Sequence, residues 1–288
     1  MSYLQGETGV NPRDALNGLA SGVLSEGEPA PVAHENPNGT SPAVVVCEHG
    51  GRRIPARLGS LGLAEEHLAK HFMWDIGALD LARAIATRLN APLIHQPYSR
   101  MVCDGNRPTT APDFIPEHGE GIPVPGNVDL SPEEVAARTA AIWQPYQDHI
   151  ASVLEARAAA STPTVFVSIH SFTPVFYGTP RPWHVGVLYD RDPVLSPALF
   201  DGLARTLGER VVGRNEPYVM SRTSDYTVPV HGEDRGLPSV EIEVRNDLIR
   251  DPTGVDQWAG VLTPALIQAA RAVGIALEDV TITREGPL

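Results

Sequence analysis

The sequence predicts an α/β domain in which helices flank a mixed, mostly parallel central sheet. Short runs of β-branched and other apolar residues, each long enough for one buried strand, recur along the chain. Segments with apolar residues at three- and four-residue spacing, typical of amphipathic helices, alternate with these runs. With 288 residues, of which 42% are hydrophobic, the chain is long and apolar enough for one such domain.

The elements follow in order after a segment rich in Gly, Pro, Asn and Ser. We expect residues 1–41 to form an extended N-terminal arm and residues 42–288 to form a single domain. The expected strands are Ala43–Cys47, Pro92–Ile94, Thr164–Ile169, Trp183–Asp190 and Val240–Val244. The expected helices are Ile76–Leu89, Pro132–Ala160, Ala198–Leu207 and Gly254–Val273.

Two local features refine this prediction. Ser131 and Glu134 form a capping-box pattern at the start of the second helix, and Pro145 predicts a kink within it. Residues 108–129 form a long loop without periodicity, and loops of this kind are more often functional than passive. We expect this loop to be a lid that moves at Gly119–Gly121.

The charge composition excludes several classes of protein. The chain has 22 Lys and Arg against 35 Asp and Glu, a net charge of −13, and Lys70 is its only lysine. A nucleotide-binding P-loop and Schiff-base chemistry each need a suitably placed lysine, so neither is expected. No basic block predicts binding to nucleic acid or to an anionic membrane. Two cysteines and no signal or membrane-spanning pattern predict a soluble, cytoplasmic protein, and nothing predicts its oligomeric state.

Histidines follow two of the expected strands. His49 comes two residues after the first strand, and His170 ends the strand Thr164–Ile169. In α/β folds ligands bind beyond the carboxyl ends of strands, and imidazole is a common zinc ligand. Asp75 is a plausible third ligand, with Glu48 as another oxygen donor or a partner of a ligand. From spacing alone, hydrogen-bonded turn histidines and an N-cap aspartate remain an equally simple interpretation.

The last expected strand carries charge on one face. Period two places Glu241, Glu243 and Arg245 together, opposite Val240, Ile242 and Val244. Carboxylates within a central strand are costly unless they are paired or bound. The pattern therefore indicates either a general base with a raised pKa or a Glu–Arg ion pair on an edge strand.

A loop after the second expected strand supplies cations. Arg100 and Arg107 flank a turn, and guanidinium groups bind carboxylates in a bidentate manner, so this loop is suited to an anionic substrate. An ion pair between Asp104 and Arg107 is the alternative. The segments 214–218 and 225–227 either line a substrate pocket or pack as ordinary loops, and the second interpretation is favoured for each alone.

These pieces, in this order, resemble the N-formylglutamate amidohydrolase family. The matching segments are Cys47–Gly51 with Ile54–Pro55, Asp75–Ala78, Arg100–Arg107, Ser168–Phe172, Val212–Tyr218 and Glu243–Arg245. The resemblance runs from about residue 43 to about residue 262. It implies a relationship to the zinc carboxypeptidase-like hydrolases, a three-layer phosphorylase/hydrolase-like fold for a single metallohydrolase domain, and zinc or another divalent metal as cofactor.

The resemblance also implies the metal ligands. His49 and His170 match the two histidine ligands of the carboxypeptidases. Those enzymes carry a glutamate ligand three residues after the first histidine, where this chain has Arg52. The carboxylate ligand must therefore come from elsewhere, and Asp75 is preferred to Glu48.

The remaining roles follow from the same resemblance. Glu243 is expected as the general base toward metal-activated water, and Arg100 is expected to stabilise the oxyanion. The substrate-binding residues are expected to be Asn106, Arg107 and Arg245. The implied reaction converts N-formyl-L-glutamate, a small anionic N-acyl amino acid, to glutamate and formate. The alternatives are a deacylase or carboxypeptidase-like hydrolase of another N-acyl amino acid, and a non-catalytic protein that binds a small acid.

Overall fold

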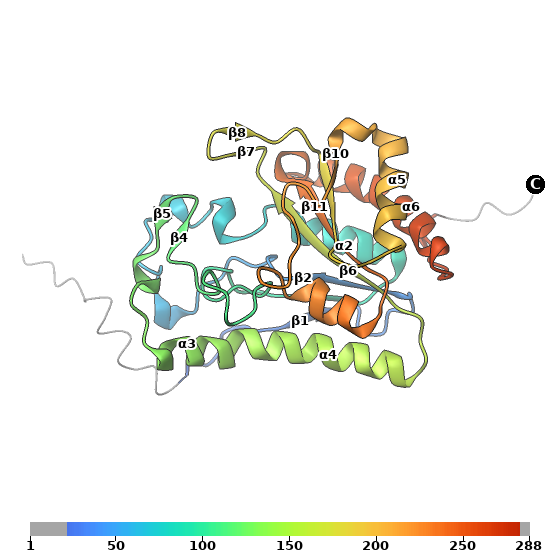
Figure 1. The fold of residues 1–288 in the computed structure, drawn as a ribbon. Helices are drawn as coiled ribbons and strands as arrows, with labels where there is room; N and C mark the ends of the chain where they lie inside the picture. The colour runs from blue at the N-terminus through green and yellow to red at the C-terminus, as the bar shows by residue number, and fades with distance from the viewer. Residues whose placement is uncertain (1–21, 283–288) are drawn as a thin grey trace, which may run out of the picture.

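A central sheet organises the computed structural model, which describes residues 22–282 (Figure 1). Its strands lie in the order β1-β3-β2-β6-β11-β9-β10. Their bounds are β1 (Ala33–Glu35), β2 (Ala43–Cys47), β3 (Leu93–His95), β6 (Val165–Phe172), β9 (Val185–Leu188), β10 (Val212–Arg214) and β11 (Ser239–Arg245). Strands β3, β2, β6 and β11 are parallel, whereas β1 and β9 pair antiparallel with β3 and β11. The predicted mixed, mostly parallel sheet is confirmed.

Helices cover both faces of this sheet and complete the three layers (Figure 1). The helices are α2 (Ala78–Leu89), α3 (Pro132–Arg138), α4 (Gln144–Ala159), α5 (Leu195–Leu207) and α6 (Pro252–Ala272). Helices α2, α5 and α6 pack on one face, and α4 packs on the other. No helix within residues 22–282 is long and apolar enough to cross a membrane.

The side chains of β11 alternate between the two faces, as period two predicts. Val240, Ile242 and Val244 are fully buried in the core shared with α2, α5 and α6. Glu241 and Glu243 therefore project from the opposite face, where β6 places His170 beside Glu243. Burial of the apolar face in this way fixes the direction of both carboxylates.

The long second helix is interrupted rather than merely kinked. Ser131 and Glu134 form the predicted capping box, and Thr139–Trp143 is π-helical before α4 begins. A proline lacks the N–H that an α-helix needs and clashes with the preceding turn, so a widened turn just before Pro145 accommodates it. The remaining short helices are η2 (Ala56–Leu58), η3 (Glu65–His67), η4 (His71–Met73), η5 (Pro125–Asn127), η7 (Glu209–Val211), η8 (Thr227–Gly232), η9 (Glu233–Arg235) and η10 (Asn246–Leu248).

Residues 108–129, the expected lid, contain a hairpin at the position of the expected hinge. Strands β4 (His118–Gly119) and β5 (Ile122–Pro123) flank Glu120 and Gly121, which both have positive φ, at 51° and 79°. This is the backbone of a tight two-residue hairpin turn. A Cβ on Gly119 would lie 2.2 Å from the ring of the buried Phe72. The Gly119–Gly121 segment is thus needed for close packing and turning.

A second hairpin of the same kind follows β6. Strands β7 (Val175–Phe176) and β8 (Thr179–Pro180) are joined by Tyr177 and Gly178, with φ of 45° and 80°. The turns of the two hairpins approach each other, since a Cβ on Gly121 would lie 3.9 Å from the ring of Tyr177.

Part of the segment expected to form an extended N-terminal arm pairs with the sheet. Residues 1–21 lie outside the described residues, but β1 falls within residues 22–41 and pairs with β3 at the edge of the sheet. His95 and Arg83 both bond to Glu35 of this strand, and Val23 is buried. A three-residue strand between Pro- and Asn-rich stretches carries too little periodicity to be recognised in the sequence.

Candidate active site and metal centre

Two neighbouring parallel strands bring the predicted histidines together. His49 follows β2 and His170 lies in β6, and their rings meet edge to face with centroids 4.8 Å apart. Asp75 joins them because its backbone N–H donates to the carbonyl of His49 at 2.9 Å. Gly77, with φ of 81°, then turns the chain into α2, where a Cβ would lie 2.2 Å from the carbonyl oxygen of Ile249. A glycine is required at this turn.

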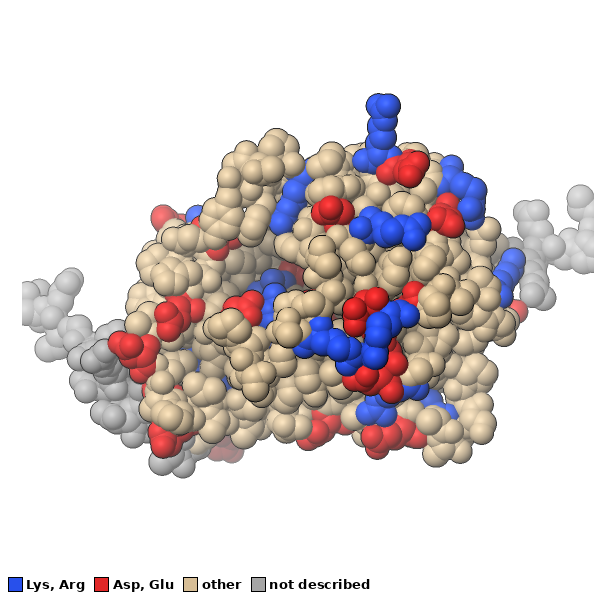
Figure 2. Space-filling view, viewed as in Figure 1, with Lys and Arg blue, Asp and Glu red and all other residues tan. Residues whose placement is uncertain are grey.

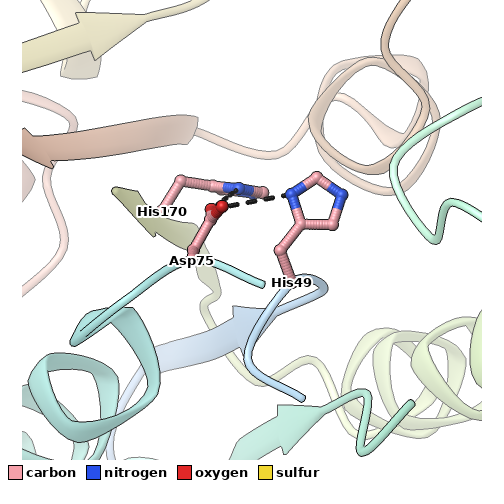
Figure 3. Close-up of side chains that lie close together, drawn as sticks. All are labelled: His49, Asp75 and His170. Carbon is pink, nitrogen blue, oxygen red and sulfur yellow. Dashed lines mark hydrogen bonds and ion pairs between the residues drawn. The ribbon is translucent and has the colours of Figure 1, made fainter. Parts of the chain in front are cut away.

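The three side chains form a compact set of ligand atoms (Figure 3). His170 Nδ1 lies 2.9 Å from Asp75 Oδ2, and His49 Nδ1 lies 3.6 Å from the same oxygen. One ligand atom from each residue can be chosen so that all lie within 4.8 Å of one another. All three residues are buried. Two imidazole nitrogens and a carboxylate are a donor set that suits a catalytic zinc with an open coordination position.

A second carboxylate faces the far nitrogen of each histidine. Asp104 Oδ1 lies 2.7 Å from His49 Nε2, and Glu48 Oε2 lies 3.0 Å from His170 Nε2. Carboxylates in this position orient metal-binding histidines and make them more basic. Glu48, which also accepts from the Ser168 hydroxyl at 2.8 Å, therefore lies on the outer side of His170. The arrangement fits a divalent metal held by His49, Asp75 and His170.

Charged neighbours keep Asp75 ionised. Burial raises the pKa of its carboxyl group, but the Arg100 guanidinium, the hydrogen bond from His170 and the interaction with His49 outweigh burial. The pKa of Asp75 consequently lies well below its usual value. Arg100 donates to Asp75 Oδ1 and to His49 Nδ1, so a cationic group already lies against two of the three candidate ligands.

Glu241 and Glu243 differ in their partners although they share one face of β11. Glu241 accepts from the Asn106 side-chain amide at 3.1 Å, whereas Glu243 Oε2 has no hydrogen-bond partner among the described residues. Burial raises the pKa of Glu241 to about 7, against the opposing charge of His170. Burial likewise raises the pKa of Glu243 well above its usual value, with His170 opposing and Asp75 adding to the rise. A buried carboxyl group with a raised pKa and a free oxygen is suited to proton transfer.

The predicted substrate-binding residues separate into two groups. Asn106 and Arg107 line the same cavity as the candidate ligands, and Arg107 is paired with Asp113 at 2.9 Å and Asp225 at 3.4 Å. The structure does not bring Arg245 to this cavity. Its guanidinium bonds to Asp247 at 2.8 Å, because the backbone turns away from the sheet directly after β11. The ion pair between Asp104 and Arg107, the alternative interpretation of this loop, is not formed within residues 22–282.

One cavity of about 610 Å³ is lined by His49, His170, Glu241, Glu243, Arg100 and Arg107. We call these histidines and glutamates, together with Asp75, which contacts both histidines, its floor. The hairpins β4–β5 and β7–β8 with residues 217–219 are its mouth. Figure 2 shows the hollow below the β7–β8 hairpin, with charged side chains inside it. The loop segments around Tyr218 and Asp225 line the cavity, contrary to the favoured interpretation of ordinary packing.

His71 is a cavity residue that was not among the predicted site residues. His71 lies four residues before Asp75, with its Nε2 3.9 Å from Asp75 Oδ1, and burial lowers its pKa to about 4. The spacing His71–Asp75 was the available signal, but the residues between them show no helical periodicity that places both on one side.

Comparisons with known proteins agree with the fold. The sequence profile described as N-formylglutamate amidohydrolase matches residues 41–250. The crystal structure of gene product Atu2144 from Agrobacterium tumefaciens is 36% identical, with a TM-score of 0.84, and the match covers 88% of this chain and 99% of that one. N-formylglutamate amidohydrolase from Ralstonia eutropha JMP134 is 22% identical with a TM-score of 0.61, and the match covers 85% of this chain and 99% of that one.

The second of these structures, at its low identity, bears on the fold alone. No curated protein matches the chain. The family profile, in contrast, spans most of the sequence, from just before β2 to the residues after β11, and so includes every residue of the floor. The chain therefore belongs to the N-formylglutamate amidohydrolase family.

Proposed function

We propose that the protein is a metal-dependent amidohydrolase that uses one water to cleave N-formyl-L-glutamate into L-glutamate and formate. The observation that carries the proposal is the floor itself: a two-histidine, one-carboxylate donor set whose histidines line the same cavity as Glu243, a buried carboxyl group with a free oxygen. Family membership supports the reaction class. Zinc suits the donor set best, and another divalent cation remains compatible with it.

His49, Asp75 and His170 would hold the metal, oriented by Asp104 and Glu48. When bound, such a cation lowers the pKa of water toward about 7 and polarises the amide carbonyl. Glu243 accepts a proton from water at its free oxygen and delivers it to the leaving amide nitrogen, which departs as the amine of glutamate. The raised pKa of Glu243 favours the first half of this transfer, since a more basic carboxylate accepts the proton more readily.

Two arginines would act on the substrate's negative charges. Arg100 lies next to the candidate ligands and is placed to stabilise the oxyanion that develops on the carbonyl. Arg107, with Asn106 beside it, would orient a glutamate carboxylate. That carboxylate has to compete with Asp113 and Asp225, which hold the Arg107 guanidinium from two sides.

Metal analysis and product detection test this proposal together. The purified protein should contain about one divalent metal per chain, and it should release formate from N-formyl-L-glutamate until a chelator removes the metal. Restoring zinc should restore the activity. A metal-loaded protein that releases no formate from this substrate would contradict the proposal.

Two properties accompany the proposal. The substrate is a small anionic N-acyl amino acid, and we propose no nucleic-acid partner. We also propose a cytoplasmic location, because Cys47 and Cys103 are buried free thiols, as is usual in a reducing compartment.

A further inference from the structure

The cavity is larger than the substrate of the proposed function requires. Its volume of about 610 Å³ lies in the range of sites that hold drug-sized ligands, roughly 300–1,000 Å³. N-formyl-L-glutamate has only about a dozen non-hydrogen atoms, well below that size. Part of the cavity is therefore left for a further group on the substrate.

The mouth has an apolar wall of exposed side chains. Phe176, Tyr218 and Val219 all line the cavity, and all belong to the large hydrophobic residues that the described part of the chain leaves exposed. Val219 is 74% exposed. Because exposed apolar surface costs free energy in water, apolar side chains gathered at the mouth of a binding cavity indicate a contact for an apolar group.

A buried arginine holds this wall in place. The guanidinium of Arg181 stacks over the Phe176 ring at 4.3 Å and over the Tyr218 ring at 4.8 Å. Its Nη1 also donates to the Tyr218 hydroxyl at 3.1 Å. Arg181 is only 8% exposed and forms no ion pair within residues 22–282. Its contacts fix the β7–β8 hairpin against the loop that carries Tyr218, so the wall is formed before any ligand arrives.

Arg107 and the wall start from different strands of the sheet. Arg107 follows β3, on one side of β2 and β6 in the sheet order, whereas Tyr218 follows β10, at the other edge. In the proposed function Arg107 holds a carboxylate of the amino-acid part, and Arg100 acts on the carbonyl oxygen. An amide bound over His49 and His170 in this way has its acyl group left to contact the wall.

We propose that Phe176, Tyr218 and Val219 form an acyl-group subsite that accepts an aryl or branched alkyl substituent. The inference rests on the proposed function and deepens it. The substrate class becomes N-acyl acidic amino acids whose acyl group is larger than formyl, and Arg181 is a positioning residue that acts through the two aromatic rings. Hydrolysis of such a substrate again consumes one water, and it releases the corresponding carboxylic acid in place of formate.

The test compares two acyl groups of similar carbonyl reactivity. The metal-loaded enzyme should hydrolyse N-phenylacetyl-L-glutamate with a kcat/KM about ten times that for N-acetyl-L-glutamate, because the phenyl ring is buried against the wall. Phe176→Ala should abolish this ratio. Val175→Ala, on the same hairpin but outside the cavity lining, should leave it within about twofold of the wild-type ratio.

Two further comparisons of substrates distinguish failure of the acyl-group subsite from failure of the proposed function. N-formyl-L-phenylalanine carries the aryl group on the amine side, so a preference for it without one for the phenylacetyl amide would overturn the assignment of the wall to the acyl group. Equal rates for the acetyl and phenylacetyl amides would overturn the subsite while formate release from N-formyl-L-glutamate upholds the proposed function.

A binding measurement does not depend on hydrolysis. In calorimetric titrations of the metal-loaded protein, phenylacetate should bind about ten times more tightly than acetate, and Phe176→Ala should remove the difference. Weakening by Arg181→Ala that Arg181→Lys partly rescues would support the positioning role of Arg181. Equal binding of the two acids would count against the subsite even if every amide were hydrolysed.

Discussion

The floor and the mouth of the cavity are built in different ways. On the floor, strand ends place buried ionisable groups, and most polar atoms face a named partner, as His49 does with Asp104 and His170 with Glu48. At the mouth, two hairpins rest on turns with positive φ and leave aromatic rings exposed. The sheet thus determines the reacting geometry, whereas the turns determine the shape around the substrate. Chemistry and selectivity should therefore respond to different substitutions.

The largest effect should come from Glu243 on the floor. Glu243→Gln removes the group that accepts and delivers the proton but keeps its volume, and kcat should fall about 10³-fold. Metal content, measured by atomic spectroscopy, should stay unchanged. Glu155→Gln, at an exposed position of α4, should leave kcat at the wild-type level. Substantial turnover by Glu243→Gln would rule out its role as the base.

The outer carboxylates of the floor should control metal affinity. Asp104→Asn removes the charged partner of His49 Nε2, and the metal affinity should fall about 10- to 100-fold. Competition with a chromophoric chelator measures the change. Asp113→Asn at the cavity rim should not alter the affinity, since Asp113 contacts Arg107 and none of the candidate ligands. Equal losses of metal affinity in both variants would contradict the proposed division of roles between the floor and the mouth.

At the mouth, close packing of a hairpin predicts an effect on stability. Gly119→Ala places a Cβ 2.2 Å from the Phe72 ring, and the free energy of unfolding should decrease by about 1–3 kcal/mol. Gly260→Ala, within α6 and with no atom within 4 Å of the added Cβ, should instead increase it by roughly 0.5–1 kcal/mol. Urea unfolding compares the two. An unaffected Gly119→Ala protein would show that the hairpin moves away from Phe72 without cost.

The smallest effect should be on substrate binding. Arg107→Gln removes a guanidinium that two carboxylates already hold, so KM for N-formyl-L-glutamate should rise about tenfold with a smaller change in kcat. Arg205→Gln, at an exposed position of α5, provides the steady-state control. A loss of kcat with unchanged KM in Arg107→Gln would indicate that Arg107 acts in the chemical step and not in substrate binding.

Local patterns were sufficient to predict most of the floor. The runs Ala43–Cys47 and Thr164–Ile169 form buried strands that are parallel neighbours in the sheet. His49 and His170, which lie at their carboxyl ends, therefore meet at one edge of the sheet. The period-two pattern of β11 likewise predicted that Glu241 and Glu243 share a face. These predictions succeeded because the extent of each strand and the choice of its buried face follow from residues that are close in sequence.

The mouth depends on contacts that sequence periodicity does not encode. Strands of two residues, such as β4 and β7, are too short to show alternation. The stacking of Arg181 on Phe176 and Tyr218 joins distant segments. Arg245 also had an unforeseen partner, because the turn after β11, which alternation along the strand does not predict, brings Asp247 to it.

The short strand β1 also has a consequence for how the chain is handled. Backbone pairing of Ala33–Glu35 with Leu93–His95 occupies the outer hydrogen-bonding groups of β3. Unpaired edges of this kind recruit strands from other molecules. A truncation at residue 41, although it would spare every residue of the floor, would expose such an edge. Aggregation, with the catalytic groups still intact, is the failure we expect of a shortened protein.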